Sequence, residues 1–129
     1  MRLGMTGSRN GMTDNQREQL HAWLATCKDI TEAHHGDCNG ADAQFHGIMQ
    51  ELGTRIVVHP PSVSGCRAYC SSEDIKSPRP FLDRNHDIVN GSDVLLAFPA
   101  TKHEELRSGT WATIRYAKKV NKPVYIFEP

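Results

Sequence analysis

The amino-acid sequence predicts an α/β fold, built as one domain over residues 1–129. Two segments, RIVVH at residues 55–59 and DVLLAFP at residues 93–99, each contain an apolar run with the composition of a strand that is buried on both faces. Amphipathic segments with helical spacing lie between the strand-like segments. Strands that alternate with helices indicate right-handed crossovers and a parallel sheet with helices on both faces. We expect a five-stranded sheet in the order 3-2-1-4-5.

A glycine-bearing loop marks the end of the first predicted strand, and a capping motif marks the start of the first predicted helix. Residues 1–5 form the strand, which runs into the glycine-bearing loop TGSRNG at residues 6–11. Thr13 and Gln16 match a capping box, in which hydroxyl and amide each satisfy an orphan backbone donor at the helix start. The apolar positions of this helix are Leu20, Trp23, Leu24 and Cys27.

A short strand and a second helix follow. The strand is expected over residues 30–34, and either Asp37 or Asn39 caps the helix. Gly53 ends the helix before the strand at residues 55–59 begins. The apolar positions of this helix are Ala41, Phe45, Ile48, Met49 and Leu52.

The C-terminal half contains a long loop and the remaining elements. Residues 61–80 show no periodicity, and a loop of this length predicts a mobile lid over a binding site. A short helix over residues 81–90 precedes the strand at 93–99, a helix begins at Gly109, and residues 124–127 form the closing strand. The apolar positions of the last helix are Trp111, Ile114, Ala117 and Val120. The elements together predict a single Rossmann-like domain.

Composition excludes some classes of function. The 15 basic and 15 acidic residues cancel, which argues against binding to nucleic acid through a basic face. No segment has signal-peptide character or membrane-spanning length, so we expect a cytoplasmic protein that does not bind membranes. The four cysteines follow no dense disulfide pattern, which favours reduced thiols.

The sheet topology predicts where a ligand would bind. In an open parallel sheet, ligands lie beyond the carboxyl ends of the strands, beside the switch in strand order. This rule brings together four polar loops: residues 6–10, residues 34–42, the segment from His59 onward, and residues 98–110. Helix starts in such loops supply backbone donors and the positive ends of dipoles, which favours phosphate or another anion.

The loop HHGDCNGAD, residues 34–42, is the most polar of the four. Gly36 and Gly40 would let the backbone approach a ligand closely. The side chains that can bond sugar hydroxyls are Asp37, Asn39 and Asp42. Helix capping by Asp37 or Asn39 is the alternative, but it accounts for only one residue of the cluster. We therefore favour a ligand-binding cradle.

A metal site is a further alternative for this loop. His34, His35 and Cys38 could act as ligands, with Cys66 and Cys70 joining from the long loop. The spacing lacks the paired motifs of zinc sites, and adjacent histidines on a strand point to opposite faces. We expect no metal and no cofactor.

Three further groups complete the predicted site. Ser8 and Arg9 follow the first strand and can bind phosphate, and Ser108-Gly109-Thr110 opens a helix in the manner of an anion site. Arg84 and Asn85 face the cleft if their short helix borders it; otherwise they form an exposed pair. The predicted ligand-binding residues are Thr6, Gly7, Ser8, Arg9, Gly36, Asp37, Asn39, Gly40, Asp42, His59, Arg84, Asn85, Phe98, Ser108, Gly109 and Thr110. We expect Trp111 to belong to the core.

In this order, the motifs GSR, HGDCNGAD, HP, RN, DVLLAFP and SGT resemble those of the SLOG superfamily. The YspA-related branch carries a G-[GS]-R loop, an HG-x-x-x-GAD motif and an RN pair, and the resemblance extends over nearly the whole chain. It implies a Rossmann-like fold and a pocket for nucleotides or nucleotide-derived ligands, ADP-ribose derivatives among them. It also implies a homodimer or a larger homo-oligomer.

Some relatives in this superfamily hydrolyse the N-glycosidic bond of nucleoside monophosphates with the glutamate of a PGG-x-GT-x-x-E motif. Here Thr113 stands at the position of that glutamate, and a hydroxyl cannot replace a carboxylate as general base. We therefore expect a non-catalytic sensor or sequestering sponge for a nucleotide-derived signal. A sponge of viral origin would be an anti-defence protein in the host cytoplasm. The alternative is a nucleotide-processing hydrolase that uses Asp37, Asp42 or Glu104 instead.

Overall fold

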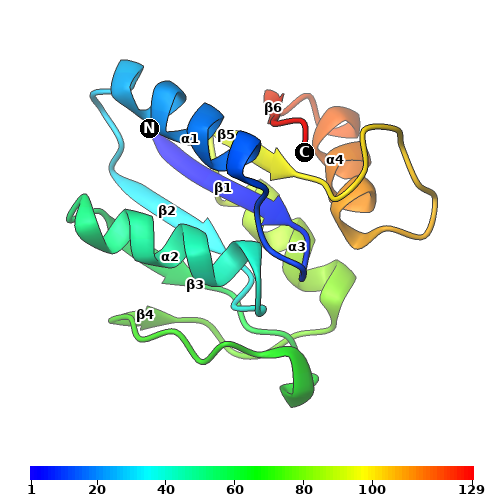
Figure 1. Cartoon of the computed structure of the whole chain (residues 1–129). Helices are drawn as coiled ribbons and strands as arrows, with labels where there is room; N and C mark the ends of the chain where they lie inside the picture. Colours follow the sequence, from blue (N-terminus) through cyan, green and yellow to red (C-terminus); the bar gives the residue numbers. More distant parts are fainter.

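The computed structural model describes residues 1–129 and shows a parallel sheet between two layers of helices (Figure 1). The sheet has six strands in the order β4-β3-β2-β1-β5-β6. The elements are β1 (Arg2–Gly7), α1 (Asp14–Thr26), β2 (Glu32–His35), α2 (Ala41–Glu51), β3 (Arg55–Val58), η1 (Ser64–Cys66), β4 (Asp74–Ile75), α3 (Phe81–Asn90), β5 (Val94–Phe98), α4 (Gly109–Lys119) and β6 (Val124–Ile126). The predicted α/β class and the relative order of the five predicted strands are confirmed.

The predicted number of strands is wrong, because the long loop contains β4. This strand pairs with β3 through only two residues, Asp74 with Val57 and Ile75 with Val58. A pairing this short leaves no periodicity in the sequence. Residues 61–80 are therefore not structureless, since they hold η1 and an edge strand.

The two faces of the sheet have separate cores, as the alternation along β1 shows. Leu3 and Met5 belong to the larger cluster, together with residues of α1 and α2. Gly4 faces the other side, where a Cβ atom would meet Ser92 and Ile88 at 3.1 Å or less. Helices α3 and α4 cover that side, with α1 and α2 in front of the sheet in Figure 1. No helix has both the length and the apolar character needed to cross a membrane.

The helix starts differ in how they are capped. Thr13 and Gln16 form the predicted capping box on α1. The predicted side-chain cap of α2 is wrong: its N-cap is Gly40, and no side chain bonds there. A free backbone amide at the start of α2 has a backbone partner instead, since the amide of Ala41 donates to the Ser8 carbonyl at 3.0 Å. Two predicted core positions at helix ends, Leu52 and Val120, are exposed.

Candidate functional site

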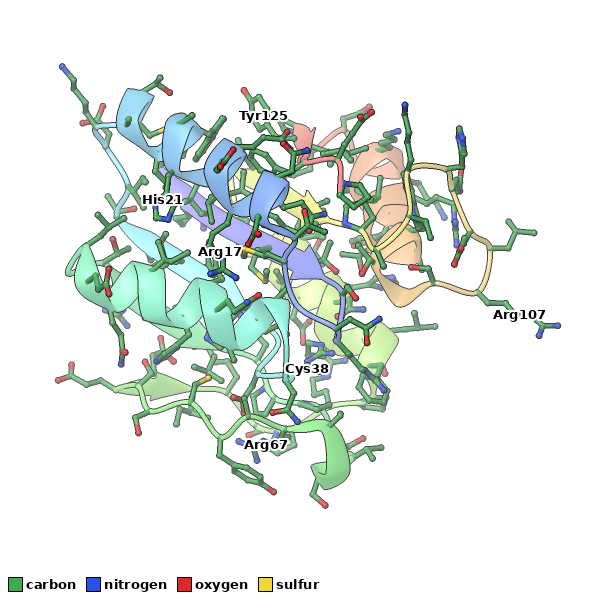
Figure 2. The ribbon with its side chains drawn as sticks, viewed as in Figure 1. Arg17, His21, Cys38, Arg67, Arg107 and Tyr125 are labelled. Carbon is green, nitrogen blue, oxygen red and sulfur yellow. The ribbon has the colours of Figure 1, made fainter.

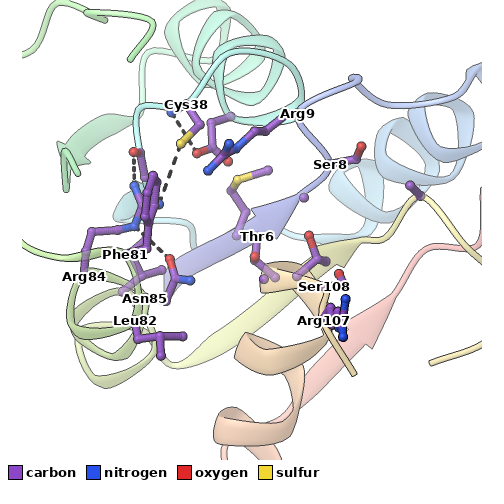
Figure 3. Close-up of a pocket in the computed structure, with 18 residues that line it drawn as sticks. Thr6, Ser8, Arg9, Cys38, Phe81, Leu82, Arg84, Asn85, Arg107 and Ser108 are labelled. Carbon is purple, nitrogen blue, oxygen red and sulfur yellow. Dashed lines mark hydrogen bonds between the residues drawn. The ribbon is translucent and has the colours of Figure 1, made fainter. Parts of the chain in front are cut away.

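A pocket of about 480 Å³ opens at the carboxyl ends of β1, β2 and β5, where the strand order switches (Figure 3). We call it the first pocket. The predicted residues that line it are Thr6, Gly7, Ser8, Arg9, Gly36, Asp42, Arg84, Asn85, Ser108, Gly109 and Thr110. The predicted residues that do not line it are Asp37, Asn39, Gly40, His59 and Phe98. The sheet topology therefore brings most of the four loops together.

The loop after β1 is held against the sheet at one side of the pocket. The Ser8 amide donates to the Phe98 carbonyl at 3.1 Å, and the Ser8 hydroxyl accepts from the Asn10 amide at 3.0 Å. The hydroxyl proton of Ser8 thus stays available to a ligand. Arg9 is exposed, and its guanidinium lies 4.9 Å from the centre of the Phe81 ring. Figure 3 shows Arg9 and Cys38 together at this end of the pocket.

Arg84 is a buried cation in the wall of the first pocket, only 5% exposed. Its Nη1 donates to the carbonyl oxygens of Gly36 and His59, and its Nε donates to Asn85 Oδ1 at 2.8 Å. Its Nη2 faces Cys38 Sγ at 3.7 Å (Figure 3). All of these partners are neutral, and no carboxylate lies within ion-pair distance of the guanidinium. A buried charge without a counter-ion is costly, so an anion in the pocket would be stabilised here.

Asp42 is the one carboxylate that lines the first pocket. It lies in the first turn of α2, and its Oδ2 accepts a hydrogen bond from the Cys38 amide at 3.0 Å. Burial raises the pKa of the Asp42 carboxyl to about 6, against the Cys38 hydrogen bond and the Arg84 charge, which lower it. The pocket lining therefore combines three arginines with one carboxyl group whose charge is partly suppressed.

The start of α4 forms the opposite end of the pocket. Ser108 is its N-cap, and the hydroxyl accepts from the Trp111 amide at 3.2 Å. The amides of Gly109 and Thr110 belong to the first turn, where backbone donors lack intrahelical partners. Arg107 lines the pocket just before the helix, on the loop that projects from the molecule in Figure 2. This arrangement suits a phosphate or carboxylate group.

The predicted site residues outside the pocket have structural roles. Asp37, with φ of 58°, is fully buried; its carboxylate accepts from Arg67 Nε at 2.9 Å and from the Cys70 amide at 2.8 Å. Asn39 is exposed and donates through its backbone amide to the Cys66 carbonyl. Phe98 is a fully buried core residue.

Gly40 has a φ of 92°, and a Cβ atom there would lie 2.3 Å from the Arg9 carbonyl oxygen. Its small size thus serves the packing of two loops rather than the approach of a ligand. His59 lies on the far side of Arg84, where it lines a different pocket.

The long loop does not roof the first pocket. None of its residues, 61–80, contributes to the lining, and the segment runs along the β3 edge of the sheet. Contacts with Asp37 and its neighbours hold it: the Ala68 amide donates to the Asp37 carbonyl at 2.7 Å, and Cys38 pairs with Arg67 in an antiparallel bridge. The geometry gives no support to the predicted lid.

The strand alternation separates His34 from His35, whereas Cys38 Sγ and Cys66 Sγ lie 3.9 Å apart. His34 bonds His59 on one face of β2, and His35 bonds His46 on the other. Two of the candidate ligands, His35 and Cys70, come together with His46, which was not predicted: their ligand atoms lie within 4.8 Å of one another.

Hydrogen bonding makes this trio a poor metal site. The Asp37 amide donates to His35 Nδ1 at 2.9 Å, so the proton of the neutral His35 ring sits on Nε2, which faces His46 Nδ1 at 2.8 Å. A metal ion on Nε2 would require an imidazolate or the loss of the Asp37 bond. We therefore read His35 as a hydrogen-bond link.

Sequence reasoning missed several lining residues, among them Cys38, Phe81, Leu82 and Arg107. Arg107 directly precedes the SGT motif, so its position was a usable signal. The sequence suggests only a metal-ligand role for Cys38, although this residue lies within the polar loop. Phe81 and Leu82 start a helix and carried no signal of their own, because apolar residues usually indicate core.

Comparison with known proteins establishes the fold alone. No protein-family model matches the chain, and no curated protein matches it. Among solved structures, the chain is similar to the X-ray structure of TM1055, a structural-genomics target, with a TM-score of 0.66 and 21% sequence identity. The similarity covers 95% of this chain and 71% of that chain. It shows that the protein has a Rossmann-like α/β fold.

Proposed function

We propose that the protein binds an anionic, nucleotide-derived small molecule in the first pocket and does not transform it. The observation that carries the proposal is Arg84, a buried cation with only neutral partners in the pocket wall. No carboxylate of the protein lies within ion-pair distance of Arg84, and Asp42 is the one carboxylate in the pocket lining. Arg9, Arg107 and the start of α4 add further positive charge to the same pocket.

The resemblance to the SLOG superfamily supports a nucleotide-derived ligand, such as an ADP-ribose derivative or a cyclic nucleotide signal. Thr113 supports binding without hydrolysis: it is buried, lies outside the pocket lining, and its hydroxyl donates to the Gly109 carbonyl at 2.9 Å. A sensor or a sequestering sponge is the function that follows. Assembly as a homodimer or larger homo-oligomer belongs to the same proposal.

A hydrolase is the second candidate, and one observation favours it. Asp42 lines the pocket with a pKa of about 6, a value suited to proton transfer near neutral pH. The other two carboxylates that could replace the missing glutamate are poorly placed. Asp37 is bonded to Arg67, and Glu104 pairs with Arg115 at 2.6 Å outside the pocket.

Native mass spectrometry with a panel of ADP-ribose derivatives and cyclic nucleotides tests the proposal. We expect a bound ligand that chromatography recovers intact after denaturation of the complex; a hydrolysed product would favour the second candidate. Arg9→Ala should weaken binding roughly tenfold, the loss of about one charge-assisted contact. Arg17→Ala is the matched control, because Arg17 is exposed on α1 (Figure 2) and does not line the pocket. Equal affinity of both variants would contradict the assignment of Arg9.

A further inference from the structure

Two cysteines from different segments meet beside the first pocket. Cys38, in the loop after β2, lines the pocket, and Cys66 is the last residue of η1 in the long loop. Their Sγ atoms lie 3.9 Å apart, although the two residues are 28 positions apart in the sequence. Sulfur atoms at this separation have to approach one another by only about 2 Å to form a disulfide bond.

The backbone fixes the two segments against one another. Cys38 pairs with Arg67 in an antiparallel bridge, and Figure 2 shows these two residues side by side. Next to this bridge, the Asn39 amide donates to the Cys66 carbonyl at 2.9 Å. Arg67 is held in turn by its buried ion pair with Asp37. The contact between the two thiols is therefore part of an ordered junction and not a chance approach of two free loops.

Hydrogen bonds link the two sulfur atoms to their surroundings. Arg84 Nη2 donates to Cys38 Sγ at 3.7 Å, so this sulfur has a positive charge beside it (Figure 3). The Cys38 thiol donates to Cys66 Sγ, and the Cys66 thiol donates to the Val63 carbonyl at 3.7 Å. A neighbouring guanidinium stabilises a thiolate, which is the form of cysteine that attacks another sulfur atom.

The two thiols differ in their access to solvent. Cys66 is half-buried, whereas Cys38 is only 7% exposed. Burial raises the pKa of the Cys38 thiol to about 11, against the Arg84 charge, which lowers it. An oxidant in solution therefore reaches Cys66 first, and Cys38 then reacts with the oxidised sulfur atom next to it.

We propose that Cys38 and Cys66 form a reversible disulfide bond, a redox-sensitive link between the wall of the first pocket and the long loop. With glutathione disulfide as the oxidant, the Cys66 thiolate attacks one of its sulfur atoms, forms a mixed disulfide and releases one glutathione. The Cys38 thiolate attacks the Cys66 sulfur and displaces the second glutathione. The two cysteine protons pass to the two glutathione thiolates, so two thiols are oxidised and one disulfide is reduced. This inference goes beyond the proposed function, because it does not depend on a ligand in the first pocket.

The other two cysteines are internal controls. Cys70 Sγ belongs to a different group of side chains, within 4.8 Å of the ligand atoms of His35 and His46. Cys27 is the C-cap of α1. In an unfolded chain, the short separation of Cys66 and Cys70 would favour a bond between these two, because closing a short loop costs less entropy. A bond between Cys38 and Cys66 therefore requires the native fold.

Oxidation of the reduced, folded protein in a glutathione buffer tests the pairing. After acid quenching and alkylation of the remaining thiols, trypsin places the four cysteines on separate peptides, because it cleaves after Lys28, Arg55 and Arg67. We expect mass spectrometry to find the Cys38–Cys66 bond in the native protein and mostly the Cys66–Cys70 bond after oxidation in urea. In the native protein, a Cys66–Cys70 bond, a stable mixed disulfide with glutathione, or no disulfide would overturn the proposal.

Two serine variants separate this bond from other effects of the oxidant. Cys66→Ser should abolish it, and Cys70→Ser should retain it. Since the bond closes a long loop, oxidation should raise the melting temperature by at least about 5 °C in the parent protein and in Cys70→Ser, but not in Cys66→Ser. Dithiothreitol should reverse the rise. An equal shift in the two serine variants, or a bond that dithiothreitol does not reduce, would overturn the proposal.

Discussion

Asp42 is a residue at which stability and ligand binding oppose one another. Its folded-state pKa of about 6 lies above the ordinary 3.8, so the folded protein binds the proton more tightly than the unfolded chain. Such a group stabilises the fold while it is protonated, and the stabilisation is lost as the pH rises through about 6. At neutral pH the buried carboxylate is therefore a cost to the fold.

Asp42→Asn should raise the melting temperature of the ligand-free protein at pH 7.5 and change it little at pH 4. The gain is at most roughly 3 kcal/mol, from a shift of about two pKa units, and the amide oxygen can still accept from Cys38. The same substitution should weaken ligand binding, because it replaces a carboxylate oxygen that can accept from a sugar hydroxyl of the ligand with an amide NH₂ group, which donates. Thermal melts at both pH values check the first part, and a lower melting temperature at pH 7.5 would contradict it.

Gly40 and Gly47 offer a matched pair of glycine substitutions in and before α2. Gly40→Val should destabilise the protein by roughly 2 kcal/mol or more, because Gly40 has a positive φ and a Cβ atom would meet the Arg9 backbone. Gly47→Ala should stabilise it by about 0.5–1 kcal/mol, since Gly47 is helical and nothing lies within 4 Å of the added atom. Urea denaturation of both variants measures the contrast. Equal midpoints would show that the Gly40 backbone can relax.

One of the contacts that hold the long loop is a buried ion pair. Arg67 Nε donates to Asp37 Oδ2 at 2.9 Å, and the Asp37 side chain is fully buried. Arg67→Met would leave that carboxylate without its cation, which costs roughly 3–5 kcal/mol in buried pairs. We expect a large loss in the free energy of unfolding, measured in urea.

Arg55→Met is the control for this prediction. Arg55 also pairs with an aspartate, Asp74 at 3.0 Å, but its side chain is 66% exposed. Exposed pairs contribute at most about 1 kcal/mol. Similar losses in the two variants would mean that burial of Asp37 is not what matters.

The elements differ in how far the sequence predicts them. Strands β3 and β5 and helix α4 were predictable, because long apolar runs and regular stripes reflect burial directly. β4 was not, since its two residues are held by pairing with β3 and by the bond from the Lys76 amide to the Val58 carbonyl at 2.9 Å. Long-range contacts of this kind have no local pattern.

The sequence predicts those residues of the candidate site whose position follows from the sheet topology alone. Arg9 and Ser108 line the first pocket because they follow strand ends that meet at one edge. Asp37 and His59 also follow strand ends, yet they lie outside it. The backbone conformation after the strand decides on which side of the sheet edge a side chain lies, and Asp37 has a left-handed conformation there. No pattern in the sequence predicts this conformation.

For the whole molecule, buried histidines predict acid sensitivity. Burial lowers the pKa of His35 to about 3 and that of His59 to about 4, and it also lowers the pKa of His46. The unfolded chain takes up these protons near the ordinary value of 6.5, before the folded protein does. The stabilisation is therefore complete above pH 6.5 and is lost as the pH falls toward 3.

The urea midpoint should accordingly fall between pH 7.5 and pH 5. The raised pKa of Asp42 makes the fold more stable as the pH falls, which is the opposite effect. Three histidines with a lowered pKa outweigh this one carboxyl group. His21→Gln should leave this dependence unchanged, because His21 is exposed on α1. A urea midpoint that stays constant over this pH range would contradict the conclusion that the buried histidines are neutral in the folded protein.

The attachment of the long loop to Asp37 also has a consequence for the order of folding. Its contacts join residues 37–39 to residues 66–70, and we expect them to form after β2 and β3 have paired. Closing such a loop adds little to the transition state, and interactions absent from the transition state affect the unfolding rate alone. In stopped-flow measurements Arg67→Met should therefore unfold faster than the parent protein while it refolds at nearly the same rate.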